Sequence, residues 1–597
     1  MNNNDNLEKI RHSLAHLMAM AVLEKYPKTK LGIGPTIENG FYYDFDKISI
    51  TNADLPELEK KIKELIKKDL KFKKEIISPA AAKKLFKNQI YKLELIKELQ
   101  SASRRAKKPI TIYKTCSDIR CQMSGVKFTD LCAGPHIKST SEINPDAFKL
   151  TKIAGAYWRG DEKNPMLTRI YGIAFETKKE LDEYLKMTEL AEKCDHRNIG
   201  EKLGFFMIDE EIGKGLPLWL PKGYAIRKKL EDYIYNIEKQ NGYLHVLTPQ
   251  IAKDELYKKS GHLAHYKDDM YAPIVIDNEK YYLRPMNCPH HHSIYKHGKR
   301  SYRELPLRIA EFGTVYRYER SGVLSGLIRI RGFTQNDAHI YATQENLEQE
   351  IAAVLNLHKK VFNDFDIKDY WYRLSLPDFK NKEKFGDVKN KKNWETGAAI
   401  LKKSLKNLGH KFTETIGEAS FYGPKIDIQM KDLYGKEDTI ATIQIDYYSA
   451  PKFNLFYIAQ NGKEKPVIVI HRAIFGSFDR FFAFLIEKTC GVLPLWLAPV
   501  QVKILAISEK HDDYAKKILE ELKNNNVDAE LVPSDETLGK RIREAELQKI
   551  PYVLIVGDKE IQNKTVNVRH YKRGQGGEIK IDELIEKIKK EIENKIA

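Results

Sequence analysis

Several long segments of the chain repeat their less polar residues at helical spacing. From Lys178 to Arg197, five such positions stand among charged residues: Leu181, Tyr184, Leu185, Thr188 and Ala191. Residues three or four apart share one face of an α-helix, so this segment is predicted to be a helix that connects two domains. Helical patterns also cover His12 to Leu23 and a lysine-rich amphipathic stretch, Leu58 to Lys74, which is typical of a solvated helix face.

The rest of the chain divides into blocks that differ in their mix of helical and strand-like segments. The block after the predicted connecting helix mixes helical segments with β-rich runs such as Thr439 to Tyr448 and Pro466 to Ile470. Beyond Pro494, strand-like and helical segments alternate: Val502 to Ile507, Tyr514 to Asn524, Tyr552 to Val556 and Ile581 to Ile596. This alternation is typical of a small α/β domain. We therefore predict an α+β multidomain protein, with domains at residues 1–175, 198–494 and 495–597 and a linker helix at 176–197.

The composition is that of a folded protein without a membrane segment. Hydrophobic residues make up 42% and charged residues 31% of the chain, and no stretch approaches the roughly 18 apolar residues of a membrane span. Met1 to Ile10 lacks the basic start and apolar run of a secretory signal, so a cytoplasmic protein is expected. The net charge of +18 is compatible with a polyanionic partner, but a general lysine-rich composition explains it equally well.

The densest group of arginines lies between Leu305 and Ile340. It comprises Arg308, Arg317, Arg320, Arg329 and Arg331, with the carboxylates Glu311, Glu319 and Asp337 close by in the sequence. A guanidinium group stays charged and matches the geometry of phosphate and carboxylate oxygens, so this set favours a site for a nucleoside triphosphate. The alternative is a set of surface ion pairs without a ligand.

Three segments resemble the signature motifs of one enzyme class. Arg317-Tyr318-Glu319 together with Arg329 to Gln335 is similar to motif 2 of class II aminoacyl-tRNA synthetases, in the form found in the threonyl family. Thr248-Pro249 stands where motif 1 carries its proline, and His471 to Arg480 resembles motif 3. The resemblance covers nearly the whole chain. It implies a class II antiparallel-sheet catalytic domain between an N-terminal α+β editing domain and a C-terminal α/β anticodon-binding domain.

The resemblance also implies roles around ATP. Arg317 would hold the α-phosphate during attack by the carboxylate of L-threonine, and Arg329 would contact the phosphates. Arg480 would stack on adenine opposite Phe333, and Glu319 would read the adenine amino group. Fixed positive charge together with Mg²⁺ stabilises the pentacoordinate phosphorus, so no general base is needed. Further contacts with substrate or ATP are implied for Gln335, Asp337, Tyr422, Lys425 and Gln444.

The six cysteines do not form a disulfide framework, so each is expected to be a core residue, a metal ligand or a catalytic group. Cys288, His339 and His471 share no local metal motif, and their spacing alone favours separate core or surface roles. The resemblance implies instead that these three bind one Zn²⁺, whose open position takes the amino group and hydroxyl of threonine and so excludes valine. Asp337 would accept the hydroxyl group. His290 stands where the family usually has glycine.

A second, hydrolytic site is implied because serine also offers an amino group and a hydroxyl, and one missing methyl is worth only roughly 1–3 kcal/mol. His12 and His16 share a helix face, while Cys132 and His136 form a second polar pair near Asp130. Each pair alone is more typical of a structural role. Together they resemble the editing domain of threonyl- and alanyl-tRNA synthetases, which hydrolyses seryl-tRNA. The threonyl family is not expected to need a metal there.

The C-terminal region carries a third resemblance. Trp496 to Val502 and Gly557 to Glu560 are similar to the anticodon-binding domain of several class II enzymes. Its base-reading positions are matched by Arg543, Glu560 and Arg569. Without the resemblance, these three are typical of ordinary surface charge. Asp535 and Thr537 replace the usual asparagine and lysine of the family.

The resemblance as a whole implies a threonine-tRNA ligase that charges tRNA(Thr) with ATP and hydrolyses mischarged seryl-tRNA(Thr). A homodimer is expected because motif 1 lies at the subunit interface in this class, and the N-terminal ubiquitin-like domain common in the family is expected to be missing. A prolyl- or seryl-type synthetase would lack the cysteine and two histidines, and a synthetase-like RNA-binding regulator would not need the ATP-binding arginines. A metalloprotease, suggested by His12 and His16, lacks the glutamate next to the first histidine.

Overall fold

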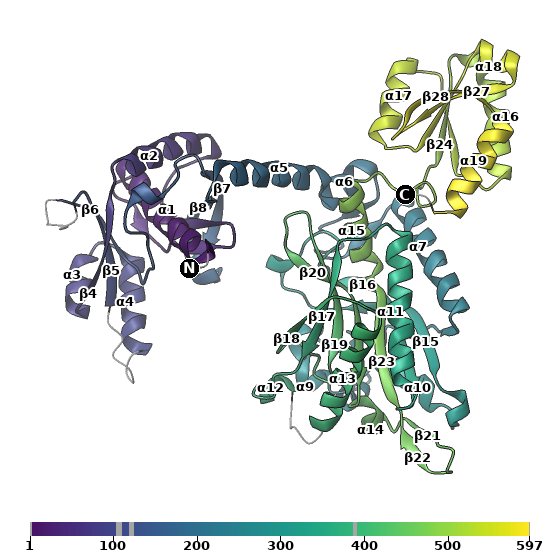
Figure 1. Cartoon of the computed structure of the whole chain (residues 1–597), viewed down its shortest axis with the longest axis horizontal. Coiled ribbons are helices and arrows are strands. Elements are labelled where there is room, and N and C mark those ends of the chain that lie inside the picture. Colours follow the sequence, from purple (N-terminus) through teal and green to yellow (C-terminus); the bar gives the residue numbers. More distant parts are fainter. Residues whose placement is uncertain (1–2, 103–109, 119–124, 386–390, 596–597) are drawn as a thin grey trace. The chain divides into compact units, whose positions relative to one another are not determined.

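The computed structural model describes residues 3–102, 110–118, 125–385 and 391–595. The chain divides into two compact units, Met1–Thr188 (unit 1) and Glu189–Ala597 (unit 2). This division falls inside α5 (Lys178–Cys194), the predicted connecting helix (Figure 1). Among the described residues, no helix has both the length and the apolar character needed to cross a membrane.

Unit 1 packs its helices against two antiparallel sheets. Its helices are α1 (Asn3–Lys25), α2 (Leu55–Lys67), α3 (Pro79–Leu85) and α4 (Ile90–Ala102). Its strands are β1 (Lys30–Leu31), β2 (Thr36–Ile37), β3 (Gly40–Asp46), β4 (Lys71–Ile77), β5 (Ile110–Cys116), β6 (Val126–Leu131), β7 (Phe148–Tyr157) and β8 (Met166–Ala174). One sheet has the order β1-β3-β8-β7, with β2 beside β3, and the other has the order β4-β5-β6. Helix α1 contacts α2, β3 and β8, so its residues lie over the first sheet.

The lysine-rich stretch predicted as one amphipathic segment to Lys74 is not a single helix. Helix α2 ends at Lys67, and the chain continues as strand β4 from Lys71. Asp69 lies between them with a φ of 51°, a left-handed conformation that ends the helix. Helix α2 is also more than a solvated face, because it buries Leu55, Leu58, Ile62, Leu65 and Ile66.

Unit 2 is built around an eight-stranded sheet with the order β11-β15-β16-β23-β20-β19-β17-β18. These strands are β11 (Tyr243–His245), β15 (Leu307–Tyr316), β16 (Gly332–Ala342), β17 (Tyr370–Leu376), β18 (Phe412–Ile416), β19 (Lys425–Lys431), β20 (Glu437–Asp446) and β23 (Ile468–Ser477). The two outermost pairs are parallel and the inner ones antiparallel. Helices α7 (Pro221–Gln240), α11 (Leu347–Asp364), α13 (Lys391–Asn407) and α15 (Phe478–Thr489) pack against the sheet (Figure 1).

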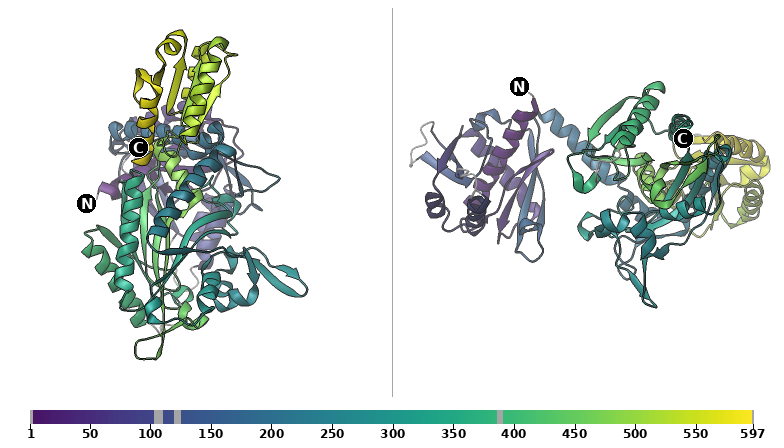
Figure 2. Two further views of the ribbon diagram at one scale, coloured as in Figure 1. Left: turned by 90° about the vertical axis from the view of Figure 1, so that its right-hand side faces the viewer. Right: turned by 90° about the horizontal axis from the view of Figure 1, so that it is seen from below.

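Shorter elements complete this part of unit 2. The helices are α6 (His196–Leu203), α8 (Asp254–Lys259), α9 (His262–His265), α10 (Cys288–Lys296), α12 (Lys382–Phe385) and α14 (Ser449–Phe453). The strands are β9 (Phe206–Ile208), β10 (Pro217–Trp219), β12 (Ile251–Lys253), β13 (Ile274–Ile276), β14 (Glu279–Leu283), β21 (Phe456–Ile458) and β22 (Glu464–Pro466). The hairpin of β13 and β14, drawn in teal, projects from the unit in Figure 2.

The alternation of side chains along the central strands separates the core from a polar face. On β16, Ala338 and Ile340 belong to the hydrophobic core, while Asp337 and His339 line a cavity. Successive side chains of a strand point to opposite faces, so the two sets are separated by the sheet. The same alternation on β20 and β23 places Ile443 and Ile470 in the core and Gln444 and His471 at the cavity.

The C-terminal part of unit 2 is the expected small α/β fold. Its sheet has the order β25-β24-β26-β27-β28, formed by β24 (Val502–Ala506), β25 (Ala529–Val532), β26 (Tyr552–Val556), β27 (Thr565–His570) and β28 (Gly574–Lys580). The helices are α16 (Asp512–Asn524), α17 (Leu538–Leu547), α18 (Asp558–Asn563) and α19 (Ile581–Glu593). Strand β24 pairs in parallel with β25 and β26, and the remaining pairs are antiparallel.

The role of Cys194 differs from the prediction. Cys194, the last residue of α5, forms a disulfide with Cys490, which follows α15. The expectation that each cysteine is a core residue, a metal ligand or a catalytic group is therefore wrong for this pair. The two cysteines are 296 residues apart, so local sequence spacing could not predict the disulfide.

A buried ion pair joins helix α7 to the central sheet. Arg472 Nη2 on β23 lies 2.6 Å from Glu238 Oε1, and both side chains are fully buried. Glu238 also accepts a hydrogen bond of 2.9 Å from Asn336 Nδ2 on β16. The pair is favourable only while both charges are present, because either one alone would be buried without compensation.

We predict that Glu238→Ala lowers the free energy of unfolding of unit 2 by about 3–5 kcal/mol, because it leaves Arg472 charged and buried without a carboxylate. Asp232→Ala on the exposed face of the same helix is the control, since its pair with Lys228 is solvated and worth less than about 1 kcal/mol. Denaturant unfolding followed by circular dichroism measures both. Equal, small losses in the two variants would contradict the prediction.

Candidate functional site

The three predicted metal ligands lie together on the polar face of the central sheet. His339 on β16 is directly opposite His471 on β23 in the antiparallel register. Cys288 is the first residue of α10. All three side chains are buried, and their ligand atoms lie within 4.8 Å of one another. Residues separated by 51 and 132 positions in the chain thus form one cluster.

Hydrogen bonds to neighbouring residues leave one nitrogen of each imidazole directed to the cluster. His471 Nε2 lies 2.9 Å from Asp446 Oδ2, and His339 Nδ1 lies 2.8 Å from Nδ1 of His291. The other nitrogen of His291, Nε2, lies 3.0 Å from a carboxylate oxygen of Glu311 and donates to it. His291 Nδ1 is then an acceptor for the N–H of His339, which leaves His339 Nε2 with a free lone pair.

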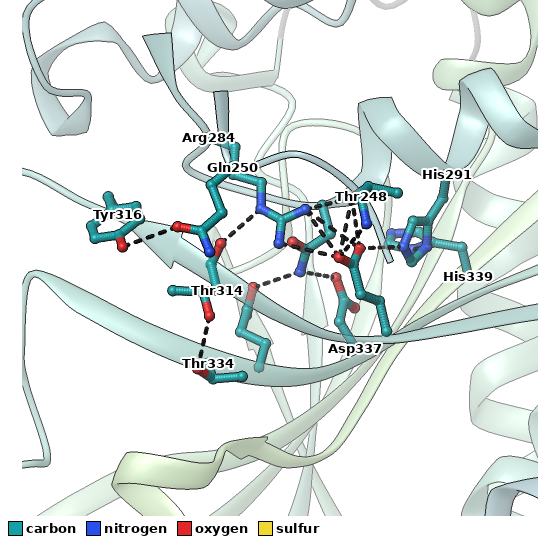
Figure 3. A network of polar contacts seen from close by, with 12 residues as sticks. Thr248, Gln250, Arg284, His291, Thr314, Tyr316, Thr334, Asp337 and His339 are labelled. Carbon is teal, nitrogen blue, oxygen red and sulfur yellow. Dashed lines mark hydrogen bonds and ion pairs between the residues drawn. The ribbon is translucent and has the colours of Figure 1, made fainter. Parts of the chain in front are cut away.

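Glu311 is the fixed end of this chain of hydrogen bonds. Burial disfavours its charged form, but the hydrogen bonds from His291 and the Thr248 amide and the charge of Arg284 hold its pKa at about 2. Figure 3 shows Arg284 and Thr248 in one polar network with His291 and His339. A permanent carboxylate therefore fixes the proton position on His291 and, through it, on His339.

The donor set fits Zn²⁺. One cysteine sulfur and two imidazole nitrogens are the ligands that zinc takes in proteins, and three protein ligands leave a coordination position open. Burial raises the pKa of the Cys288 thiol well above its usual value, so the thiolate needs a neighbouring cation to form. His290, the departure from the family pattern, is not part of the group whose ligand atoms lie within 4.8 Å.

The cluster opens into a cavity of about 900 Å³. The predicted residues that line it are Cys288, Arg317, Gln335, Asp337, His339, Tyr422, Lys425, Gln444 and His471. The Tyr422 ring stacks on the His471 imidazole, with ring centroids 4.8 Å apart. Asp337 accepts a hydrogen bond of 2.9 Å from Asn287 Nδ2, so its carboxylate is held in place beside the three ligands.

A second, smaller cavity of about 180 Å³ adjoins the first. Its lining includes the predicted nucleotide residues Arg317, Glu319, Arg329, Phe333 and Arg480. Arg317 and Gln335 line both cavities. The guanidinium of Arg317 lies over the Phe333 ring, 5.1 Å from its centroid. Arg317 therefore stands at the place where a ligand in one cavity meets a ligand in the other.

The other arginines of the group between Leu305 and Ile340, together with Arg480, differ in whether they line a cavity. Arg329 forms an ion pair of 3.0 Å with Glu319, and Arg480 Nε donates to the carbonyl oxygen of Ile328 at 3.0 Å. Burial lowers the pKa of Arg480. Arg308 lies at the far end of β15 and pairs with Glu350 on α11. It lines neither cavity, and neither do Arg320 and Arg331.

Sequence reasoning missed His262 on α9. Its imidazole is buried, and Nδ1 lies 2.7 Å from Ser260 Oγ. Burial and the charge of Arg317 lower the pKa of His262 to about 3, so this ring is neutral beside the larger cavity. No motif marks it, because its proximity to Arg317 and His471 arises only from the fold.

The four residues of the predicted hydrolytic site also lie together, in unit 1. Cys132 Sγ lies 3.2 Å from His12 Nε2 and 3.3 Å from His136 Nε2. The group of His12, His16, Cys132 and His136 has all its ligand atoms within 4.8 Å. His16 Nε2 lies 3.7 Å from Asp130, the fifth predicted residue.

Two further residues at this site were not predicted. Lys92 Nζ forms a buried ion pair of 2.5 Å with Asp130, and Tyr43 donates a hydrogen bond to the same carboxylate. Lys92 is one of many lysines in helical segments, so its burial could not be recognised in the sequence. Together, the lysine and the tyrosine fix Asp130 beneath His16.

Burial sets the protonation of this cluster. It lowers the pKa of His16 and His136 well below the usual value and raises the pKa of the Cys132 thiol to about 12. At neutral pH the imidazoles are neutral and the thiol is protonated. Within the described part of the chain, His16 Nδ1 has no hydrogen-bond partner. The site therefore offers neutral imidazoles and no thiolate nucleophile.

The predicted anticodon-binding residues are dispersed over the C-terminal α/β part. Arg543 is exposed on α17, and Arg569 on β27 forms an ion pair of 2.6 Å with Glu546. Glu560 is buried, and its carboxylate accepts a hydrogen bond of 3.0 Å from the Gly557 amide at the start of α18. Thr537 caps α17 by accepting from the Lys540 amide. Base reading by these residues stays a prediction.

Three segments of the chain match known domain families. Residues 271–489 match the tRNA synthetase class II core domain (G, H, P, S and T), and residues 501–591 match the anticodon binding domain. Residues 110–171 match the second additional domain of threonyl and alanyl tRNA synthetases. The antiparallel sheet with its arginine-lined cavities and the matched core domain define a class II aminoacyl-tRNA synthetase.

Relatives identify the family within this class. The chain is 45% identical to the threonine--tRNA ligase of Oceanobacillus iheyensis, over 99% of this chain and 90% of that protein, and 46% identical to that of Staphylococcus carnosus, over 97% and 87%. Among solved structures, the RNA binding domain of threonyl-tRNA synthetase from Cryptosporidium parvum superposes with a TM-score of 0.62 at 35% identity, over 66% of this chain and 98% of that one. The chain belongs to the threonyl-tRNA synthetase family. Prolyl-tRNA synthetase from Cryptosporidium parvum, at 18% identity and a TM-score of 0.51, shares the fold.

Proposed function

We propose that the chain is a threonine-tRNA ligase, which activates L-threonine with ATP and transfers it to tRNA(Thr). The observation that carries this proposal is the cluster of Cys288, His339 and His471 in a cavity that shares Arg317 with a second, arginine-lined cavity. An amino acid in the first cavity and ATP in the second bring a carboxylate and an α-phosphate together at Arg317. The guanidinium neutralises charge that grows on the phosphorus oxygens as the carboxylate attacks.

The nucleotide is held by residues of the smaller cavity. We assign Phe333 and Arg480 to the two faces of adenine. We assign Arg329 to the phosphates, together with the Mg²⁺ that enters with ATP. Glu319 pairs with Arg329 in the free enzyme. Binding of ATP therefore exchanges this ion pair for contacts of Arg329 with phosphate and of Glu319 with the adenine amino group.

Threonine is selected at the cysteine–histidine cluster, for which Cys288, His339 and His471 would hold Zn²⁺. When bound, the ion would supply coordination positions, on expansion to five-coordination, that an amino group and a β-hydroxyl could occupy together, whereas valine has no hydroxyl to offer. Asp337, fixed by Asn287, accepts the proton of the threonine hydroxyl in a hydrogen bond. Gln335, Tyr422 and Gln444 line the same cavity and complete its polar wall.

We predict that Cys288→Ser reduces the zinc content of the purified protein from about one ion per chain to near zero and lowers threonine-dependent ATP–pyrophosphate exchange by at least about 100-fold. His358→Ala, which removes a buried imidazole on α11 outside the groups of candidate metal ligands, is the control, with unchanged zinc. Metal analysis and the exchange assay with threonine, serine and valine measure the effect. A metal-free Cys288→Ser enzyme that still prefers threonine to valine would refute the proposed selection.

Unit 1 is proposed to hydrolyse seryl-tRNA(Thr). The support is the cluster of His12, His16, Cys132 and His136 above the fixed carboxylate of Asp130, together with the family match of residues 110–171. His16, whose Nδ1 has no hydrogen-bond partner among the described residues, is proposed as the group that accepts a proton from water. Cys132 and the remaining histidines would position the water and the 3′ end of the tRNA.

We expect His16→Ala to slow hydrolysis of preformed seryl-tRNA(Thr) about 100-fold or more, since it removes the proton acceptor. Threonine activation should stay within about twofold of the unchanged enzyme, because His16 lies outside the unit that holds the activation cavities. Deacylation of radiolabelled seryl-tRNA and the exchange assay give the two rates. Retention of full hydrolysis in His16→Ala, with a folded unit 1, would rule out this assignment.

The chain is also proposed to act as a homodimer that binds tRNA(Thr) through its C-terminal α/β part. Leu247, which follows edge strand β11, is 90% exposed, and Leu244 on that strand is 58% exposed. Ile274, Val275 and Ile276 on the projecting hairpin are exposed as well. Exposed apolar residues beside a sheet edge favour an interface between subunits, as motif 1 implies.

Leu247→Asp is predicted to convert the dimer to a monomer, because it places a charge in an apolar interface. Ile416→Asp is the control: Ile416 is 71% exposed on β18, at the opposite edge of the same sheet. Sedimentation equilibrium distinguishes the two masses. A wild-type monomer at micromolar concentration, or identical behaviour of both variants, would exclude this interface.

A further inference from the structure

His196 at the start of α6 contacts two elements of the activation site although it lines neither cavity. Its imidazole is 1% exposed. Nδ1 lies 2.6 Å from Oε1 of Glu487 on α15, and Nε2 lies 3.0 Å from the backbone nitrogen of Leu327. Leu327 belongs to the motif 2 segment between β15 and β16, ten residues after Arg317 in the sequence.

The two partners leave this histidine one arrangement of its proton. A carboxylate only accepts and a backbone N–H only donates, so the proton is on Nδ1 and the lone pair of Nε2 faces Leu327. Glu487 thereby orients the ring, and the ring satisfies a buried backbone amide of the motif 2 segment.

The amide belongs to a tight turn that carries Arg329. Ser325 and Arg329 close the turn by two backbone hydrogen bonds, with N···O distances of 3.0 and 3.2 Å. The Leu327 side chain between them is fully buried in the hydrophobic core. Gly326 has a φ of 48°, and a Cβ atom there would lie 2.0 Å from His196 Nε2. Only glycine therefore lets the turn approach the imidazole.

Helix α15 holds this turn from two sides. Arg480 donates directly to the carbonyl oxygen of Ile328, and Glu487 acts through His196 on the amide of Leu327. Arg480 and Glu487 are two helical turns apart and so share one face of α15. The turn is thus held at two backbone groups immediately before Arg329, the amide of Leu327 and the carbonyl oxygen of Ile328.

The structure assigns His196, oriented by Glu487, as a positioning residue that holds the turn of residues 325–329 so that Arg329 meets the ATP phosphates. This assignment rests on the proposed roles of Arg329 and Arg480 in ATP binding. Arg329 is half exposed and forms an ion pair with Glu319, so its placement depends on the backbone that carries it.

A metal site is the competing interpretation, since ligand atoms of Asp195, His196 and Glu487 lie within 4.8 Å of one another. Both imidazole nitrogens are already engaged, however, and Asp195 caps α6 and binds the Arg197 guanidinium through both oxygens. An ion would have to displace these contacts. The geometry therefore favours positioning over metal binding.

The Cys194–Cys490 disulfide spans the same junction. Cys194 precedes His196 by two residues, and Cys490 follows Glu487 by three. The covalent link keeps α6 close to α15 even when the hydrogen bonds are lost. Measurements with reductant present therefore isolate the contribution of the histidine.

The test is the steady-state kinetics of ATP–pyrophosphate exchange by the full-length enzyme under reducing conditions. We expect His196→Ala to raise KM for ATP about tenfold, the factor for one lost buried hydrogen bond, and to change KM for threonine less than twofold. His196→Gln should recover to within about threefold of the unchanged enzyme, because the amide nitrogen can donate to Glu487 and the carbonyl oxygen can accept from Leu327.

His358→Ala is the matched control, since it removes another fully buried imidazole, on α11, whose ring nitrogens have no hydrogen-bond partner among the described residues. Its KM for ATP should stay unchanged. Gly326→Ala provides a second route should His196→Ala not fold, because it pushes the turn from an intact His196 and should likewise raise KM for ATP.

The outcomes separate the inference from the function on which it rests. If Arg329→Ala raises KM for ATP but His196→Ala and Gly326→Ala do not, the positioning role is wrong and the proposed ATP site stands. If Arg329→Ala leaves KM for ATP unchanged, the ATP role of Arg329 fails and the inference fails with it. Equal rises in KM for ATP and threonine, or loss of a bound metal ion in His196→Gln, would also overturn the positioning role.

Discussion

The antiparallel register of β16 and β23 places His339 directly opposite His471, and the start of α10 adds Cys288 to the pair. This register also places a neighbouring group of the amino-acid site. Because side chains alternate along a strand, Asp337 two residues before His339 faces the same cavity, whereas Ala338 between them enters the core. A shift of one residue in either strand would move the imidazoles to the core side and remove the site.

Buried polar contacts behind the sheet face keep this register and orient its side chains. Glu311 and His291 fix the proton on His339, while Asp446 does so for His471. Such groups are costly to bury alone and favourable only as a complete network, which makes the arrangement rigid. Buried hydrogen bonds also hold the proposed ATP site in place, but they come from other residues. There, helix α15 holds the motif 2 turn through Arg480 and, by our inference, through His196.

Local sequence patterns and the resemblance were sufficient to predict the α+β fold and the alternating strands and helices after Pro494. They also pointed to residues within the motifs, such as Arg317. The rest depends on contacts between distant segments. Lys92 and His291 occupy ordinary helical positions, and only the fold shows that they hold Asp130 and His339. The pairing of Cys194 across 296 residues has no local signal either. The end of α2 was misplaced because the helical pattern continues past Asp69 into residues that pair as a strand.

We propose that a cysteine and two histidines form one zinc site that selects the amino acid. X-ray absorption at the zinc edge of the purified enzyme counts the ligands of the bound ion without any substitution. We expect about one zinc per chain, with one sulfur at about 2.3 Å and two nitrogens at about 2.0–2.1 Å in its coordination sphere. A zinc ion without a sulfur ligand, or an active enzyme without zinc, would contradict it.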